Sequence, residues 1–304
     1  MIYLENFTLP KDEWEDWYFS PNIAALQGKN LEVFLELSER FVNKDKIPYP
    51  NRMTGYVSWY PWRVFYQRGI RRFSFDDITI LYGSNGSGKS SLLNIIAQKM
   101  KLQRSALYNK SPFFEDYLQY CDGYLNKEKG SHLAVQRGVI LTSDDVFDRM
   151  LRNRGENQNI DFKREQLVNE YFHTEEWMPK SLSCSKYVKS KLKRNVQEQS
   201  NGETAFNYFV ESTPENALIL LDEPENSLAA TWQMELAKFL SGAIRAFNCQ
   251  LIIATHSPFL LAIPGAKIYN LDAEPISTCR WNKLENVRAY YDFFKTHQEL
   301  FEGI

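Results

Sequence analysis

The chain has 304 residues, and its 36 Lys and Arg side chains against 38 Asp and Glu give a formal net charge of −2. A charge so close to zero does not favour coating of nucleic acid by bulk electrostatics. The 43% hydrophobic and 24% charged content is ordinary for a globular protein and excludes the disordered and collagen-like classes. No apolar run approaches the roughly 18 residues of a membrane helix, and the start lacks a signal-peptide pattern. We therefore expect a cytoplasmic chain with no membrane partner.

The first clear pattern in chain order lies around a glycine-rich loop. Residues 73–82 are rich in β-formers, the glycines at 83, 86 and 88 interrupt them, and Leu92, Leu93, Ile95 and Ile96 then recur at helical spacing. This order predicts a strand, a glycine turn and a helix.

The loop between that strand and helix satisfies G-x-x-x-x-G-K-[ST], the phosphate-binding pattern. Glycines let successive backbone N–H groups converge on phosphate oxygens, and the helix adds its positive N-terminal dipole. We expect Lys89 to reach the β- and γ-phosphates and the Ser90 hydroxyl to bind Mg²⁺. The predicted nucleotide-binding residues are Gly83, Ser84, Asn85, Gly86, Ser87, Gly88, Lys89, Ser90 and Ser91.

The middle of the chain, residues 101–200, is polar and interrupted. Its one strand candidate, Gly138 to Leu141, ends in Thr142-Ser143-Asp144-Asp145, and charged helical pieces follow without sustained heptads. We expect this insertion to be a lobe and not a rod.

Past residue 205 the pattern becomes that of a parallel sheet. Ala217 to Leu221 and Leu251 to Ala254 are continuous apolar runs, as expected of strands buried on both faces, and a helical apolar stripe from Leu228 to Leu240 lies between them. This is a β-α-β crossover in a doubly wound α/β sheet. The last segment places Val287, Tyr290, Tyr291, Phe294 and Phe301 on one face of a helix that we expect to close the domain.

Polar residues follow both apolar strands, at the edge where ligands of open α/β sheets bind. Asp222 and Glu223 follow the first strand, so Asp222 is predicted to hold Mg²⁺ and Glu223 to accept a proton from the attacking water. Thr255-His256-Ser257 follows the second strand, and His256 is predicted to contact the γ-phosphate or that water. ATP and Mg²⁺ are the expected substrate and cofactor.

The glycine loop, Leu221-Asp222-Glu223-Pro224 and Thr255-His256-Ser257, in this order, resemble the ATP-binding-cassette ATPases of the SMC and RecF-like branch. Within it the chain is most similar to small stand-alone bacterial AAA-type ATPases related to the ATPase half of OLD proteins. The resemblance implies one P-loop domain over residues 1–304, with a mixed sheet, a helical signature lobe and no coiled coil. Residues 1–100 would hold the first strands, P-loop and first helix, 101–204 the insertion and signature lobe, and 205–304 the Asp-Glu pair, the histidine and the last helix.

Such cassettes carry a signature motif that closes over the ATP of a partner chain. The matching residues here are Ser200, Asn201, Gly202 and Glu203. Ser200 would donate to the γ-phosphate at a helix N-terminus, and Gly202 would permit close backbone approach; a plain helix cap is the alternative interpretation.

The sequence departs from the family pattern in two places. No glutamine follows the strand of residues 138–141, and we propose Asp144 or Ser143 as the substitute on the Mg²⁺ side. The loop Glu225-Asn226-Ser227-Leu228 is typical of the branch, but Ala229 and Ala230 stand where an acid is usual, so communication between the two ATP sites is expected to differ.

A basic stretch precedes the signature motif. Most runs of this kind are solvated faces; the functional alternative is a surface for DNA or RNA, or for an acidic partner. The residues that would contact the nucleic acid are Lys186, Lys189, Lys191, Lys193 and Arg194.

These features favour an ATPase that forms a homodimer on ATP binding and reopens on hydrolysis. The resemblance implies DNA repair or phage-defence contexts with a separate effector protein. The alternatives are the nucleotide-binding subunit of a transporter and an ATP-gated interaction module with little turnover.

Overall fold

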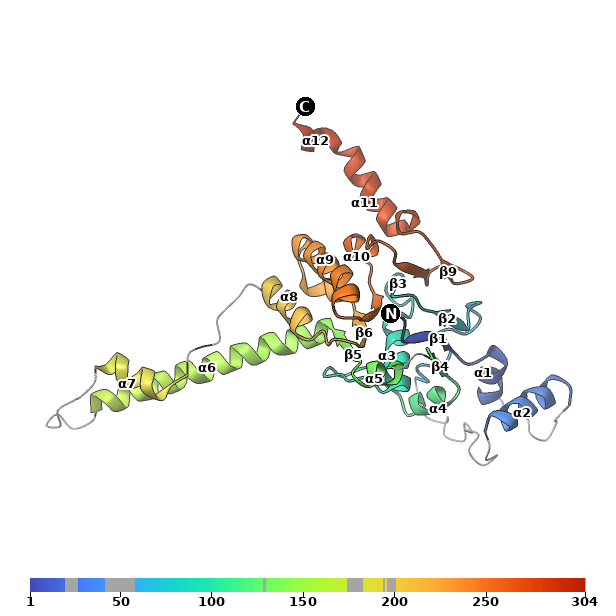
Figure 1. Cartoon of the computed structure of the whole chain (residues 1–304), viewed down its shortest axis with the longest axis horizontal. Coiled ribbons are helices and arrows are strands. Elements are labelled where there is room, and N and C mark those ends of the chain that lie inside the picture. The colour runs from blue at the N-terminus through green and yellow to red at the C-terminus, as the bar shows by residue number, and fades with distance from the viewer. Residues whose placement is uncertain are drawn as a thin grey trace.

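The computed structural model describes residues 1–19, 27–41, 58–127, 130–173, 183–193, 195 and 201–303. Figure 1 shows a body built around two sheets, from which long helices project. The strands are β1 (Leu4–Thr8), β2 (Arg72–Ser74), β3 (Ile78–Tyr82), β4 (Asp122–Leu125), β5 (Val139–Thr142), β6 (Leu218–Asp222), β7 (Gln250–Ala254), β8 (Lys267–Asn270) and β9 (Ser277–Thr278). Among the described residues, no helix has the length and apolar character needed to cross a membrane.

The helices surround these sheets and extend beyond them. They are α1 (Asp12–Phe19), α2 (Lys29–Arg40), α3 (Lys89–Met100), α4 (Phe114–Gln119), α5 (Ser131–Gln136), α6 (Ser143–His173), α7 (Cys184–Lys191), α8 (Asn201–Glu211), α9 (Ala230–Ala246), α10 (Pro258–Leu261), α11 (Glu285–Thr296) and α12 (Gln298–Glu302). Short 3-10 turns, η3 (Pro224–Ser227) and η4 (Trp281–Lys283), precede α9 and α11.

The larger sheet has the strand order β5-β6-β7-β3-β8-β9, in which β5 to β8 run parallel and β9 is antiparallel. The central strands β6, β7 and β3 are buried along almost their whole length because both of their faces are covered. In β6, Leu218 and Leu220 contribute to one core, and Ile219 and Leu221 contribute to the other. The predicted α/β fold with a mixed sheet is confirmed.

The smaller antiparallel sheet, β2-β1-β4, explains why α3 buries a broad apolar side. Leu92, Leu93, Ile95 and Ile96 are all fully buried in the core that also takes in residues of both sheets. A helix with so broad an apolar side needs to be covered by more than one element. The run of residues 73–82 that the sequence suggests as one strand is therefore two strands, β2 and β3, in different sheets.

The side chain of Gln250, at the start of β7, joins the two sheets. Its Oε1 accepts hydrogen bonds from the backbone N–H groups of Tyr3 (2.9 Å) and Leu4 (2.8 Å), and its Nε2 donates to the carbonyl of Leu4 at 2.9 Å. Gln250 is fully buried, so these bonds satisfy an amide that would otherwise be costly to bury.

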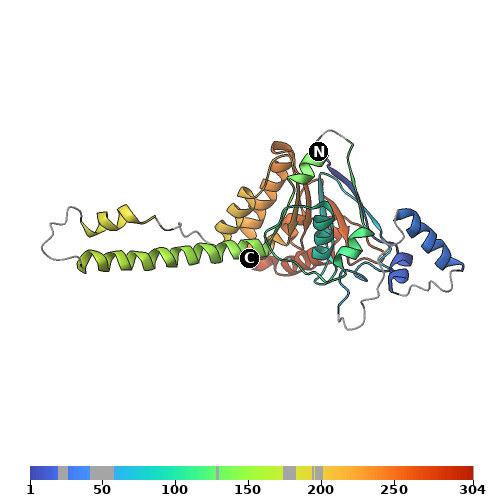
Figure 2. The same cartoon turned by 90° about the horizontal axis from the view of Figure 1, so that it is seen from below.

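The insertion is more elongated than the lobe that the sequence predicts. Its main element, α6, is one helix of 31 residues that leaves the body, and Figure 2 shows the shorter α7 lying beside its far part. At 8 residues, α7 is far shorter than the three or four heptads of a coiled coil.

The last helix also differs from its prediction. Of the aromatic face expected to close the domain, Tyr290, Tyr291, Phe294 and Phe301 are between 47% and 71% exposed, and Val287 alone is buried. Figure 1 shows α11 and α12 projecting away from the body beside β9. An amphipathic pattern records an apolar face and does not say what covers it.

Candidate functional site

The loop that follows β3 has the conformation that its glycines permit. Gly86 and Gly88 have φ angles of 86° and 98°, and Gly88 is the N-cap of α3. A Cβ on Gly83 would lie 2.4 Å from Ser87 Oγ, so a larger residue there would push Ser87 out of the loop. The turn places the free N–H groups of the first turn of α3 at the sheet edge, where an anion can bind.

Lys89 lies inside this loop and is only 4% exposed. Its Nζ donates to the carbonyls of Gly83 (2.9 Å) and Ser84 (3.2 Å) and lies 3.2 Å from Glu223 Oε1. A buried ammonium needs such partners to offset its loss of hydration.

Ser90 and Asp222 form a pair of oxygen donors. Ser90 Oγ donates to Asp222 Oδ1 at 2.9 Å, although the residues are far apart in sequence. Burial raises the pKa of Asp222 to about 6; the bond from Ser90 opposes this rise, and the neighbouring charge of Glu223 adds to it. A carboxylate that is costly to ionise when alone is suited to a cation.

These two oxygens fit Mg²⁺, which prefers oxygen ligands and keeps several waters. Among the described residues, no group of three or more His, Cys, Asp and Glu side chains forms a ready-made metal site. The protein would therefore supply Ser90 and Asp222, and phosphate oxygens and water would complete the shell.

Glu223 is held in an unusual backbone conformation at the end of β6. Its φ of 46° is left-handed, which costs a non-glycine residue on the order of 1 kcal/mol or more, and its N–H donates to the Ala254 carbonyl at 2.9 Å. Asn226 Nδ2 donates to Glu223 Oε2 at 3.0 Å. Burial alone raises the pKa of Glu223, but the Asn226 bond and the Lys89 charge outweigh it, and the pKa lies below its ordinary value. Glu223 is thus ionised at neutral pH and can accept a proton.

Asp144 and Ser143 line the same cavity as Ser90, Asp222 and Glu223. The cavity has a volume of about 550 Å³ and also takes in Asn94, Arg104, Tyr108, Thr142 and Asn226. Asp144 therefore lies on the side of the site that the sequence predicts. Its neighbour Asp145 is buried and structural, because its Oδ2 accepts from the N–H and hydroxyl of Thr142 at 2.8 and 2.9 Å.

His256 follows β7 and lies beside the first residues of the glycine loop. It lines a second cavity, of about 500 Å³, together with Gly83, Ser84 and Asn85. Asn286 Nδ2 donates to the His256 carbonyl at 3.1 Å, which ties this segment to α11. The structure thus brings His256 to the loop, on a different cavity from that of Asp222.

Two acidic residues hold this edge together, and the sequence analysis gives neither a role. Glu225, only 6% exposed, accepts through Oε1 from Thr255 Oγ1 (2.7 Å) and from the N–H of His256 (2.8 Å). Asp272 accepts from Ser84 N (2.7 Å) and Ser84 Oγ (2.8 Å). Asp272 comes just after β8, as Asp222 comes at the end of β6. The expectation that ligand-binding residues follow the carboxyl ends of parallel strands could therefore also have located Asp272.

Arg104 is a third residue that the sequence analysis missed. It lines the Asp222 cavity, donates from Nη1 to Asn94 Oδ1 at 2.9 Å and stacks 4.1 Å from the Tyr108 ring centre. Burial lowers its pKa. No pattern in the sequence around it points to this position.

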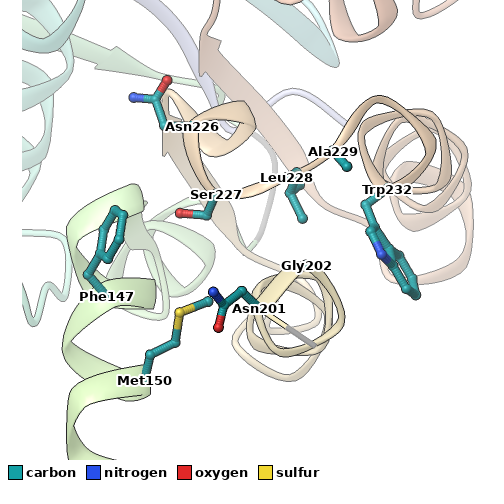
Figure 3. Close-up of a pocket in the computed structure, with 9 residues that line it drawn as sticks. All are labelled: Phe147, Met150, Asn201, Gly202, Asn226, Ser227, Leu228, Ala229 and Trp232. Atoms are coloured by element: carbon teal, nitrogen blue, oxygen red, sulfur yellow. The ribbon is translucent and has the colours of Figure 1, made fainter. Parts of the chain in front are cut away.

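The signature residues lie away from the chain's own glycine loop. Asn201, Gly202 and Glu203 begin α8, and Ser200 is outside the described residues. Figure 3 shows Gly202 facing Trp232 of α9, and a Cβ on Gly202 would lie 2.7 Å from Trp232 Cδ1. Close packing of α8 against Trp232 within the chain is therefore a second reason for a glycine at position 202.

A cavity of about 500 Å³ separates these residues from α6 and η3 (Figure 3). Its lining residues are Phe147, Met150, Asn201, Gly202, Asn226, Ser227, Leu228, Ala229 and Trp232. Asn226 lines both this cavity and that of Asp222, so η3 connects the two.

Four lysines of the basic stretch are exposed. Lys186, Lys189 and Lys191 belong to α7, and Lys193 follows it; Arg194 is outside the described residues. Figure 2 shows α7 beside the far part of α6, well away from the sheet edge.

Residues 187–262 match the family model described as "AAA domain, putative AbiEii toxin, Type IV TA system". The match spans about a quarter of the chain and includes Asp222, Glu223 and His256. The matched segment therefore resembles that AAA domain, and the strand before the glycine loop lies in the same parallel sheet as the matched strands. No curated protein matches the chain significantly.

Several solved structures resemble the chain at low similarity. Stu0660 of Streptococcus thermophilus is 12% identical, with a TM-score of 0.38 over 69% of this chain and 74% of that one. A putative metal-chelate type ABC transporter in an inward-facing conformation is 19% identical, with a TM-score of 0.35 over 73% and 80%. The bacterial ABC transporter cassette MJ0796, solved as a dimer, is 14% identical, with a TM-score of 0.35 over 66% and 85%. Likenesses at this level carry no information about what this chain binds.

We predict that Asp222→Asn flattens the pH dependence of stability. Because the pKa of Asp222 is raised, the folded state binds this proton more tightly than the unfolded state does. The resulting stabilisation is complete below about pH 4 and is lost as the pH rises through about 6. Urea denaturation at several pH values should show the free energy of unfolding falling more steeply with pH in the parent than in the variant. The exposed Asp148→Asn is the control and should follow the parent; equal slopes for the parent and Asp222→Asn would contradict the assignment.

Proposed function

We propose that this chain binds ATP with Mg²⁺ at the glycine loop, closes as a head-to-tail homodimer and hydrolyses the ATP to reopen. The observation that carries the proposal is the meeting of Lys89, Ser90, Asp222 and Glu223 within hydrogen-bonding or ion-pair distance at one sheet edge. These side chains come from segments far apart in the sequence, and each has a chemistry that phosphate transfer to water requires.

Each residue has a separate task in this proposal. The glycine loop and Lys89 bind the phosphates, Ser90 and Asp222 hold Mg²⁺, and Glu223 accepts the proton of the attacking water. Bound Mg²⁺ would neutralise phosphate charge. Catalysis then consists of positioning and charge stabilisation, which is sufficient for the loose transition state of phosphoryl transfer. His256 is assigned to the γ-phosphate side, with Glu225 fixing its backbone.

The second chain enters because the signature residues do not share a cavity with the glycine loop. Asn201 and Gly202 line the cavity beside α6, while Gly83, Ser84 and Asn85 line that of His256. A head-to-tail pair would bring the signature of one chain, including Ser200, to the ATP of the other. Each ATP site is then complete only when both chains are present. Because ATP binding brings the chains together, ATP acts as a switch.

We place the chain in the SMC and RecF-like branch, near the ATPase half of OLD proteins, on the loop Glu225-Asn226-Ser227-Leu228. A role in DNA repair or phage defence through an effector protein follows from that placement. A transporter subunit and an ATP-gated module with little turnover are the competing functions.

We predict that Glu223→Gln binds ATP but turns it over at least about 100-fold more slowly, because the amide keeps the shape and cannot accept a proton. It should accumulate as a dimer when ATP is added. Phosphate release and light scattering after size exclusion measure the two effects.

The exposed Glu215→Gln, at the opposite end of β6, is the matched control and should behave as the parent does. If Glu223→Gln keeps parental turnover, Glu223 is not the base. A parent without turnover would favour the gated module, and copurification with a membrane subunit would favour the transporter.

Exposure of Lys186, Lys189, Lys191 and Lys193 favours nucleic acid as a partner, because no carboxylate interrupts this surface between residues 183 and 193. We predict that replacing these lysines and Arg194 with Gln weakens binding of duplex or single-stranded probes. Each lost phosphate contact should reduce the salt slope by up to about 0.9.

Fluorescence anisotropy at two salt concentrations, with and without a slowly hydrolysed ATP analogue, makes the measurement. Nucleotide binding should be unchanged in this variant. If the variant binds the probes as tightly as the parent does, or if the parent binds none, these lysines form an ordinary solvated face and do not contact nucleic acid.

A further inference from the structure

The two projecting parts of the chain expose large apolar side chains. On α11 and α12, the exposed fractions are 47% for Tyr290, 52% for Tyr291 and Phe294, and 71% for Phe301. Their spacing places them along one side of the helical segment, and Phe294 and Phe301 contact each other with ring centres 5.8 Å apart. We call these four residues the α11 face. Apolar surface of this extent is normally covered by a partner.

The α11 face begins at the glycine loop. Asn286, at the start of α11, donates from its backbone N–H to the Tyr82 hydroxyl (3.2 Å) and from Nδ2 to the His256 carbonyl (3.1 Å). Glu285, Asn286 and Ala289 line one cavity with Gly83, Ser84 and Asn85. Tyr290 follows directly, so whatever lies against the glycine loop also lies next to the α11 face.

A second apolar surface begins at the signature residues. Phe147 and Leu151 of α6 are 53% and 62% exposed, and they share a helix face because they are one turn apart. Phe147 lines the cavity of Gly202 and Trp232 (Figure 3). We call Phe147 and Leu151 the α6 face. Figure 1 shows α6 and α11 leaving the body in different directions, so neither covers the other in one chain.

We propose that the α11 face of one chain docks on the α6 face of a second copy. The inference rests on the proposed head-to-tail dimer, which puts the glycine loop of one chain against the signature residues of the other. Because one face adjoins the loop and the other adjoins the signature, the same arrangement brings them together. A two-fold axis then makes the contact twice and leaves neither face open.

Each face carries charges of both signs. Arg152 and Arg154 are exposed beside Leu151, with Asp148 next to Phe147. Glu299 and Glu302 are exposed on α12, with Arg288 and Lys295 over the Tyr291 ring. Pairing of the α6 arginines with the α12 glutamates would fix the register of the contact.

The area is also appropriate for a dimer. An aromatic side chain buries roughly 150–250 Å² when fully covered. Covering the exposed half of four rings in each of the two chains therefore buries on the order of 800 Å² of accessible surface in the dimer. That is a large share of the approximately 1,600 Å² of a standard interface, and the remainder would come from the nucleotide-binding surfaces.

Cysteine cross-linking tests this pairing. Cys184 and Cys279, the partly exposed thiols, are replaced with Ser, and Phe294→Cys and Leu151→Cys are made separately in chains that also carry Glu223→Gln. After mixing with ATP and a mild oxidant, we expect disulfide-linked dimers in the mixture and not in either variant alone, and at least tenfold less product without ATP.

A second variant needs no cross-link. Tyr291→Ser with Phe294→Ser changes exposed side chains, so it should fold, bind ATP as the parent does and weaken ATP-induced dimerisation at least tenfold. Leu133→Ser, which also alters an exposed apolar side chain, is the control and should dimerise normally.

The outcomes separate this inference from the proposed function. If ATP produces a dimer by light scattering but the mixture does not cross-link and the double Ser variant dimerises normally, the docking is wrong and the switch stands; the α11 face then belongs to a different protein. Cross-linking of Phe294→Cys with itself would show α11 pairing with α11 and would overturn the proposed contact. If no dimer forms with ATP, both proposals fail.

Discussion

The parallel pairing of β6, β7 and β3 is the constraint on which the site depends. Asp222 is opposite Ala254, and Ala254 is opposite Leu81, so the three strands end at the same level. The segments that follow them, with Glu223, His256 and Gly83, must therefore emerge side by side. This alignment in turn requires apolar residues on both faces, which α3 and the smaller sheet cover on one side and α8, α9 and α10 cover on the other.

The charges at this edge compensate one another, but not completely. Lys89 is neutralised by Glu223, whose pKa is lowered by the Asn226 hydrogen bond and the Lys89 charge. Burial raises the pKa of Asp222, whose hydrogen-bond partner is the hydroxyl of Ser90. A bound cation would relieve Asp222, and a bound anion would give Lys89 a stronger partner than the loop carbonyls. The arrangement is consistent with binding a metal and a phosphate together.

Several parts of this site follow from sequence because they depend on local chemistry. A turn with two left-handed glycines and apolar strands buried on both faces leave direct signatures, and these located Lys89, Ser90, Asp222 and Glu223. The contacts of Glu225, Asp272 and Arg104 depend on which loops meet in space, so single-sequence patterns give them little weight. Only Asp272, just after a strand, carried a usable signal.

The two wrong expectations about shape share one cause. Periodicity predicts that α6 and α11 are helices with an apolar side, but it does not identify the surface that covers that side. In one chain neither apolar side is fully covered, and α6 extends as a single long helix. The division of residues 73–82 between two sheets was missed for a related reason, because strand pairing is a long-range property.

Calorimetric titration of ATP with Mg²⁺ into the parent and into Lys89→Ala tests the central claim most directly. The account predicts saturable binding by the parent and loss of binding by the variant, because the variant lacks the buried ammonium that faces the phosphates. Lys238→Ala, which removes an exposed lysine on α9, should bind as the parent does. Equal ATP affinity in the parent and in Lys89→Ala would contradict the assignment of the glycine loop as the nucleotide site.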